Sequence, residues 1–222
     1  MSSSASRRPS AARLAATLGL GPHPEGGWFR ETYRAPHEVW TPRGPRAAST
    51  AILFLVTPES PSRFHRLASD ELWVFQAGEP LDLVTIEDGR GRHRVLGDAV
   101  AGLRAQALVR AGVWQAARVA GTAGVLTTHA TARKAAGARA GTDAAAEADT
   151  TVDDATVDDT TVDDTTVDDT TVDDATPGEG AVWSLVSCVV TPGFADEDFE
   201  LARRDDLVRR HPHLARLIET LT

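Results

Sequence analysis

The segment that most limits how this chain can fold is an acidic repeat, TVDDATVDDTTVDDTTVDDTTVDDA, at residues 151–175. It contains five copies of TVDD at a period of five residues. Each copy offers one apolar side chain and two like charges, so the repeat cannot bury enough surface to offset the entropy of ordering its backbone. A solenoid would need small inward residues in every coil, and a calcium loop would need shaping glycines. We therefore predict that the repeat is disordered.

The repeat belongs to a longer stretch of low complexity. Upstream of it, residues 121–149 are rich in Ala, Gly and Thr, and Val125 and Leu126 are their only large apolar residues. We predict a disordered acidic insertion over residues 121–180, which interrupts one domain formed by residues 10–120 and 181–222, and a disordered tail over residues 1–9. About 160 residues remain for the domain, enough for a substantial core. A long insertion at one hairpin is tolerated because loop-closure entropy grows slowly with length.

The net charge of −9 is a property of the insertion. The five repeats carry ten aspartates, and without them the formal charge is about +1. With a nearly neutral domain and no basic stripe, we expect no nucleic-acid partner. We also expect no membrane association, because no apolar segment is long enough to cross a bilayer. The single cysteine, Cys188, cannot form an internal disulfide, and this favours a reducing, cytoplasmic location.

Strand patterns dominate the rest of the chain. A short helix is expected over Ser10–Leu18, with Ser10 as its N-cap and Gly19 after its end. The segment 198–222 has helical spacing of its leucines, and Pro212 divides it into two helices. Strands are predicted where apolar residues alternate or run continuously between Gly, Pro and Asp: GWFRETYR, STAILFLV, DELWVFQAG, PLDLVTIED, RHRVLG, AQALVRAGVWQAARV and AVWSLVSCVVTPG. This order of elements predicts an all-β sandwich or barrel with short terminal helices.

The stretch PHPEGGWFRETYR, at residues 22–34, is unusually constrained for the start of a strand. Its two prolines fix φ, and its two glycines permit a close approach of the backbone to its neighbours. Such a turn would hold Glu25 at the mouth of a barrel and lead into the strand that carries Arg30 and Tyr33. A purely structural role, as the crossing strand of a dimer, is compatible with the same features.

Four motifs occur in order: PHPEGGWFRETYR, FHRLASDELWVFQAGEPLDL, AGVWQAA and TPGFADEDFE. Together they resemble the Cupin_5 (DUF985) family of the cupin superfamily, whose members are loosely described as predicted sugar epimerases. The resemblance covers nearly the whole chain outside the tail and the insertion. It implies a double-stranded β-helix (the cupin jelly roll), a small-molecule pocket inside the barrel, and a homodimer. The epimerase description rests on fold similarity, which is a weak basis for chemistry.

The resemblance also implies where a metal would bind. Metal-dependent cupins hold a divalent ion with two or three histidines and a glutamate, and such ligands suit Mn, Fe, Ni or Zn. Glu71, with six residues between it and Gly78, matches the glutamate position. The histidine pair upstream is missing, because only His65 is present, and Gln115 stands where the second motif has its histidine. We therefore predict no cofactor, with a divalent metal disfavoured.

Acid–base chemistry without a metal needs a base to remove a proton beside a carbonyl, a donor for the enolate, and an acid on the other face. His65 is the candidate base, because an unperturbed histidine titrates near neutral pH. Asp70 or Glu71 would orient it, and Tyr33, the only tyrosine, would be the acid. His65, Glu71 and Tyr33 are thus the predicted catalytic residues.

A second set of side chains is predicted to bind the ligand. Arg30 or Arg34 would bind a phosphate or carboxylate, buried glutamine amides would need a polar partner, and tryptophans would supply a flat wall. The predicted ligand-binding residues are Glu25, Arg30, Asp70, Gln76, Gln106, Trp114 and Gln115. The structural alternative is that His65 caps a turn, that the carboxylates pair with arginines at the rim, and that the tryptophans fill the core.

Two functions fit these residues. One is an isomerase or epimerase that acts on a sugar-like polar substrate by acid–base chemistry, with His65 as the base. The other is a non-catalytic cupin that binds or senses a metabolite in the same pocket. A metal-dependent cupin enzyme is a third, which the missing histidines disfavour. In each case the partner is a small polar molecule.

Overall fold

The computed structural model of the chain describes residues 8–121 and 182–222. Residues 122–180 of the predicted insertion, residue 181 of the predicted domain and residues 1–7 of the predicted tail lie outside these ranges. The last two residues of that tail make contacts with the domain. Arg8 forms an ion pair with Glu79, and the Nε1 of Trp183 donates to the backbone oxygen of Pro9 at 2.9 Å. The domain therefore starts slightly earlier than the predicted residue 10.

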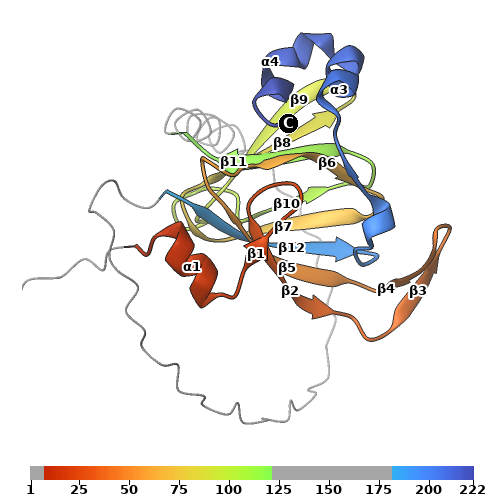
Figure 1. The fold of residues 1–222 in the computed structure, drawn as a ribbon, viewed down its shortest axis with the longest axis horizontal. Helices are drawn as coiled ribbons and strands as arrows, with labels where there is room; N and C mark the ends of the chain where they lie inside the picture. The colour runs from red at the N-terminus through yellow and green to blue at the C-terminus, as the bar shows by residue number, and fades with distance from the viewer. Residues whose placement is uncertain (1–7, 122–181) are drawn as a thin grey trace, which may run out of the picture.

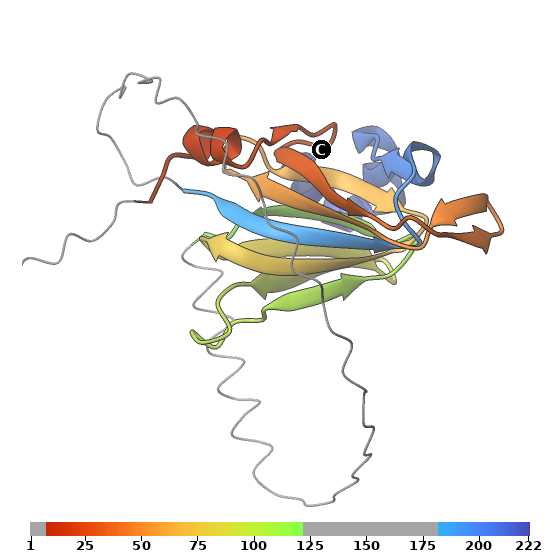
Figure 2. The same cartoon turned by 90° about the horizontal axis from the view of Figure 1, so that it is seen from below.

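Two antiparallel sheets lie face to face, and Figure 2 shows them edge-on. The first sheet has the order β1-β2-β5-β12-β7-β10. Its strands are β1 Gly21–Pro22, β2 Trp28–Arg34, β5 Thr50–Val56, β12 Ser184–Thr191, β7 Asp70–Gly78 and β10 Gln106–Val109. The second sheet has the order β13-β6-β11-β8-β9. Its strands are β13 Phe199–Leu201, β6 Ser62–Leu67, β11 Trp114–Val119, β8 Leu81–Glu87 and β9 Arg90–Leu96.

The main core fills the space between the two sheets. It contains large side chains from both: Phe54, Trp73, Leu81, Leu83, Leu96 and Val186. The continuous apolar run of β5 packs on both faces of its sheet, as is typical of a strand covered on both sides. Phe54 points into this core, whereas Leu55 packs on the outer face of the sheet with Ala15 and Trp183.

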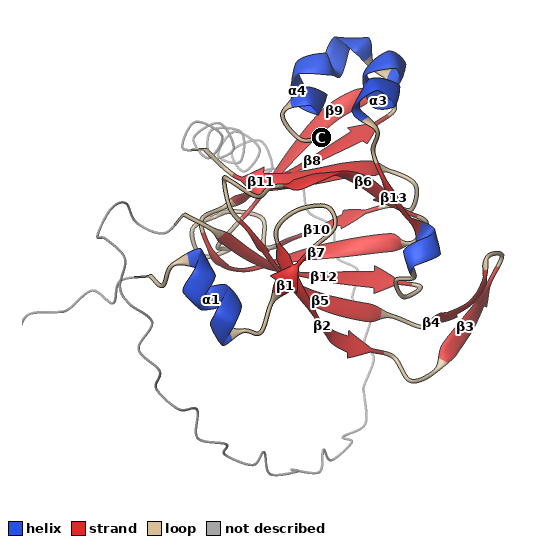
Figure 3. Cartoon of the chain, in the orientation of Figure 1, coloured by secondary structure: helices blue, strands red, loops and turns tan. Residues whose placement is uncertain are grey.

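Short helices cover the outer faces (Figures 1 and 3). Helix α1, Ala11–Thr17, begins as predicted at Ser10, whose Oγ accepts from the backbone N–H of Arg13 at 3.2 Å. Helices α3 (Arg204–Arg210) and α4 (Ala215–Glu219), joined by the 3₁₀ turn η2 (Pro212–Leu214), pack on the second sheet. No helix in the described part of the chain has the length and apolar character needed to span a membrane.

The segment before α3 differs from the predicted helix. Residues Asp196–Asp198 form a 3₁₀ turn, η1, and residues Phe199–Leu201 form β13, which pairs with the end of β6. A hairpin that the strand patterns did not indicate, β3 (Glu38–Thr41) with β4 (Gly44–Ala47), projects from the body (Figure 1). Its buried Arg46 binds both carboxylate oxygens of Asp198, with Nε at 2.8 Å and Nη2 at 3.1 Å. The hairpin thus holds η1 in place.

Candidate functional site

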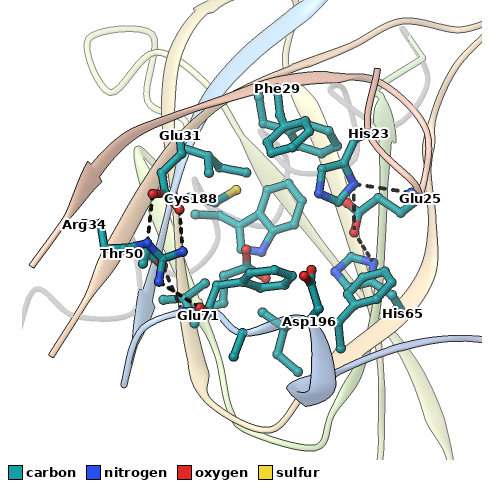
Figure 4. A pocket seen from close by; sticks show the side chains of 18 of the residues that line it. His23, Glu25, Phe29, Glu31, Arg34, Thr50, His65, Glu71, Cys188 and Asp196 are labelled. Carbon is teal, nitrogen blue, oxygen red and sulfur yellow. Dashed lines mark hydrogen bonds and ion pairs between the residues drawn. The ribbon is translucent and has the colours of Figure 1, made fainter. Parts of the chain in front are cut away.

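A cavity of about 460 Å³ opens between the sheets on the side of η1. Its apolar walls include five aromatic side chains: Phe29, Phe54, Trp73, Phe194 and Phe199. Its polar lining includes His23, Glu25, Glu31, Arg34, His65, Glu71, Asp196 and Glu197. Figure 4 shows two polar groups on opposite sides, with His23, Glu25 and His65 on one side and Glu31 with Arg34 on the other.

The PHPEGG turn brings Glu25 into the cavity. Its glycines allow this because the backbone runs against β5 and the start of β6. Gly27 has φ +70°, and a Cβ there would lie 2.7 Å from the backbone oxygen of Leu55. A Cβ on Gly26 would lie 2.1 Å from the backbone oxygen of Pro61, which no side chain could tolerate. The predicted close approach of this turn to its neighbours is therefore present.

Glu25 and His65 lie in contact in the lining of the cavity. Ser62 Oγ donates to Glu25 Oε1 at 2.7 Å, and Glu25 Oε2 lies 3.1 Å from His65 Nδ1. The same Nδ1 lies 2.9 Å from the backbone oxygen of Arg63. Because a backbone carbonyl can only accept, Nδ1 carries the proton, and in the neutral ring Nε2 is left as the basic nitrogen.

Glu71 approaches the cavity from the other sheet and is fixed by a short chain of hydrogen bonds. The Nε2 of Gln115 donates to Glu71 Oε2, and Trp73 Nε1 donates to Gln115 Oε1 at 3.0 Å. The indole can only donate, so it determines which end of the Gln115 amide faces Glu71. Since all three side chains are buried, this chain leaves Glu71 little freedom to turn.

Burial changes the protonation of the whole cluster. It raises the pKa of Glu25 to about 8, although the Ser62 hydrogen bond acts in the opposite direction. It raises the pKa of Glu71 to about 7. Burial also lowers the pKa of His65, and it lowers that of His23 to about 4, with His65 adding to the effect. The 3.1 Å contact between His65 Nδ1 and Glu25 Oε2 therefore joins two largely neutral groups at neutral pH.

A β-bulge in β2 decides which side chains reach the mouth of the cavity. Phe29 pairs with Phe54 and Glu31 with Ile52, after which the register shifts and Arg34 pairs with Thr50. Simple alternation would put Tyr33 on the same face as Glu31, but the extra residue turns Tyr33 outward and Arg34 inward. Arg34 then binds Glu31 through two nitrogens, Nη2 to Oε2 at 2.7 Å and Nε to Oε1 at 2.9 Å.

The comparisons with known proteins agree with this architecture. The profile of the family described as "Cupin superfamily (DUF985)" matches residues 12–132. The chain belongs to the Cupin_5 family. The family resemblance and the double-stranded β-helix predicted from the four motifs are thereby confirmed. No protein of curated function matches the sequence.

Solved structures resemble this cupin over nearly its whole length. A hypothetical protein from Leishmania major has a TM-score of 0.65 and 29% identity, covering 96% of this chain and 99% of that chain. A protein from Shewanella oneidensis has a TM-score of 0.64 and 25% identity, covering 97% and 98%. Oxalate decarboxylase from Bacillus subtilis is more distant, at a TM-score of 0.43 and 8% identity, covering 90% and 36%. At that distance the likeness says nothing about activity.

The cupin brings together three of the predicted site residues: His65, Glu71 and Glu25 all line the cavity. Gln115 lies one step behind them, as the partner of Glu71. The carboxylate that contacts His65 Nδ1 is Glu25, in place of the predicted Asp70 or Glu71. This partner comes from the constrained turn, far from His65 along the chain.

The other predicted residues lie elsewhere. Tyr33 is 50% exposed on the outer face of β2, and Arg30, Gln76 and Gln106 are also exposed. Asp70 pairs at the surface with Arg110, Nη1 to Oδ2 at 2.7 Å, and accepts from the backbone N–H of Ala111. Trp114 packs under α3 and α4, with the Arg66 guanidinium 4.7 Å from its ring centre. Inward and outward positions on these strands depend on register, which short apolar patterns did not determine.

Sequence reasoning missed several residues of the cavity, above all His23, Glu31 and Asp196. His23 has a signal in the sequence, because it stands in the same constrained turn as Glu25. Glu31 could have been found from the alternation that puts it on the face of Phe29. Asp196 gave no local signal, since η1 and the residues before it are held at the cavity by long-range contacts, among them Arg46 with Asp198 and Thr50 with the backbone of Phe194.

The donor atoms do not fit the divalent ion that the cupin superfamily suggests. Among the described residues, no group of three His, Cys, Asp or Glu side chains is arranged to hold a metal ion. The Nδ1 of His65 is directed at Arg63 and Glu25, and Glu71 Oε2 accepts from an amide. Of the neighbouring side chains, Leu67 has no ligand atom, and the amide of Gln115 is a weak ligand for such an ion. No chemical step is therefore derived through a metal.

Proposed function

We propose that this cupin binds a small polar molecule in its cavity and moves a proton on it, as an isomerase or epimerase does. The observation that carries the proposal is the opposed pair of His65 and Glu71. His65 comes from β6 of one sheet and Glu71 from β7 of the other, and both line the cavity. A substrate between the sheets would have a proton acceptor on one side and a proton donor on the other.

His65 is suited to the role of base. Its Nδ1–H is directed at Arg63 and Glu25, so the lone pair of Nε2 is free to take a proton from a carbon next to a carbonyl. The imidazolium that forms is stabilised by the Glu25 carboxyl group, whose Oε2 lies 3.1 Å from Nδ1, and by the backbone oxygen of Arg63. This arrangement supports proton removal near neutral pH, where the buried ring is neutral.

Glu71 is suited to the role of acid, which Tyr33 cannot fill from the outer face. Its pKa of about 7 leaves a substantial protonated fraction at neutral pH. The acid form can protonate either the enolate oxygen or the opposite face of the carbon, and the remaining carboxylate is stabilised by the Gln115 amide. In an isomerisation, Glu71 protonates the enolate oxygen, the His65 imidazolium gives its proton to the neighbouring carbon, and the Glu71 carboxylate takes the hydroxyl proton of the enediol. In an epimerisation, Glu71 protonates the opposite face of the carbon, and the proton held by His65 returns to Glu71 through solvent after the product leaves. Neither route needs an oxidant or a reductant.

The test is exchange of carbon-bound hydrogen with solvent. The full chain is incubated in deuterium oxide with a panel of aldoses and ketoses, and deuterium uptake is followed by mass spectrometry and NMR. We expect uptake at the carbon beside the carbonyl in one class of compound. Replacing His65→Gln should lower the rate at least about a hundredfold, because general base catalysis contributes that much or more.

Matched variants make the result specific. Glu71→Gln should also lower the exchange rate, whereas His37→Gln and Glu59→Gln, which change exposed residues outside the cavity, should not. Binding without exchange in the wild-type protein would refute catalysis and favour a metabolite-binding cupin. Exchange that persists in His65→Gln would refute the assignment of the base.

A further inference from the structure

The charged side chains of the cavity form an unequal set. Five carboxyl groups line it, from Glu25, Glu31, Glu71, Asp196 and Glu197, against a single guanidinium from Arg34. Burial keeps Glu25 largely protonated and Glu71 partly protonated at neutral pH, so the permanent charges are those near the mouth. The net charge of the side chains near the mouth is negative, and this charge favours cationic over anionic ligands.

Among the described residues that line the cavity, Arg34 is the only arginine or lysine, and its two-point face is already occupied. Nε and Nη2 bind the two carboxylate oxygens of Glu31, and Nη1 donates to the backbone oxygen of Phe194 at 3.2 Å. An anionic ligand that used this two-point face would have to displace Glu31, and elsewhere on the guanidinium it would lie close to the Glu31 carboxylate. Arg34 is therefore a poorer phosphate or carboxylate site than an unpaired arginine at a cavity mouth.

Asp196, unlike Glu31, is a carboxylate of the cavity without an ion-pair partner among the described residues. It lines the cavity and forms no ion pair with any other described residue, although Arg34 lies close enough to interact with it electrostatically. Glu197, next to it, is paired with Arg46 from outside the cavity at 3.2 Å. Figure 4 shows Asp196 between the Glu31–Arg34 pair and His65, facing the middle of the cavity.

Aromatic rings line the same cavity as this carboxylate. Phe194 and Phe199 have ring centres 6.2 Å apart, and Phe199 stacks on His65 at 5.6 Å. Aromatic faces together with a carboxylate attract an organic cation, through the ring quadrupole and through charge. A phosphate would meet these faces and the carboxylates near the mouth, while Arg34 is already bound to Glu31.

We infer that the ligand of the cavity carries an ammonium group, which binds Asp196 between the aromatic rings, and carries no phosphate or carboxylate. The inference rests on the proposed function only for the location of the ligand. It assigns the class of substrate to an amine-bearing polar molecule, such as an amino sugar, whose carbon skeleton extends from the mouth toward His65 and Glu71.

The test uses four probes that share one ring: glucosamine, glucose, glucuronate and glucose 6-phosphate. Binding to the full chain is measured by isothermal titration calorimetry at neutral pH and low salt, with no turnover required. We expect glucosamine to bind about tenfold more tightly than glucose, and the two anions to bind more weakly than glucose. Asp196→Asn should remove the advantage of glucosamine over glucose, whereas Asp205→Asn, an exposed change on α3, should preserve it.

Each outcome decides the inference. Equal binding of glucose and glucosamine, tighter binding of either anion, or no binding of any probe at millimolar concentration would overturn it. Loss of the preference in Asp196→Asn would support it. Because Asp196 is exposed, this variant is expected to fold. The exchange assay with His65→Gln is independent, so catalysis can fail while the charge preference holds, and the reverse.

Discussion

Replacing Glu25→Gln should change how the stability of the cupin depends on pH. Glu25 is 4% exposed, and burial raises its pKa from 4.5 to about 8. The folded state thus favours the protonated carboxyl more strongly than the unfolded state does. The sign follows from linkage: Glu25 costs nothing below its unfolded pKa, and it destabilises the fold increasingly as pH rises toward its folded pKa.

The size of the effect can be worked out from the shift. Complete ionisation of Glu25 in the folded protein would cost about 5 kcal/mol. From about pH 5 to about pH 8, the part that develops is about 3 kcal/mol. Glutamine keeps the shape and can still accept from Ser62 through its Oε1, but it does not titrate. The wild-type protein should therefore lose about 3 kcal/mol more than the variant over this range.

The assay is urea denaturation of both proteins at several pH values, and the quantity of interest is the difference between their free energies of unfolding. Taking the difference removes contributions common to both proteins. His23 and His65 make one such contribution. Their pKa values are lowered in the folded protein, so the free energy of unfolding decreases as pH drops below 6.5, the pKa of an unperturbed histidine. Glu59→Gln, on the surface, is the control and should follow the wild type. A flat difference between wild type and Glu25→Gln would refute the argument that buried Glu25 is largely protonated at neutral pH.

Two further changes test the supports of the site. Trp73→Phe removes the donor that satisfies the buried Oε1 of Gln115, so it should lower the free energy of unfolding by about 1–3 kcal/mol in urea denaturation; no measurable loss would contradict the hydrogen-bond chain. Gly27→Ala should cost about 2–4 kcal/mol, because φ is positive and its Cβ would meet the Leu55 oxygen. Gly89→Ala, with φ +72° and open space around it, should cost only about 1–2 kcal/mol in the same measurement, and equal losses for the two glycines would argue against close packing of the turn.

The parts of the fold that are determined by residues close together in the sequence could be predicted. The capping of α1 by Ser10 and the course of β7 over residues 70–78 follow from the local sequence, and both are observed. The three residues of β13 could not be predicted, because they form a strand only by pairing with β6. An isolated segment of that length has too few apolar positions to show a period.

The candidate site divides in the same way. His65 and Glu71 could be located because the motif containing both lies on two consecutive strands. The pairing of His65 with Glu25 could not, since the turn and β6 meet only in the folded molecule. Arg34, and not Tyr33, faces the cavity because of a bulge in the pairing of β2 with β5. Alternation within β2 alone would place Tyr33 on the face of Glu31 and Arg34 on the opposite face, so it does not reveal that Tyr33 lies outside the cavity.

The location of His65 and Glu71 on different sheets has a further consequence. In the proposed reaction, the gap that a substrate must bridge depends on the thickness of the core, which Phe54 and Trp73 fill from the first sheet and Leu83 from the second. Enlarging or shrinking a core side chain would alter how far a proton has to travel, even where that side chain never touches the ligand. Selection for reaction rate would then act on interior residues, and relatives with different substrates would differ in the volume of their cores as well as in the lining of their cavities.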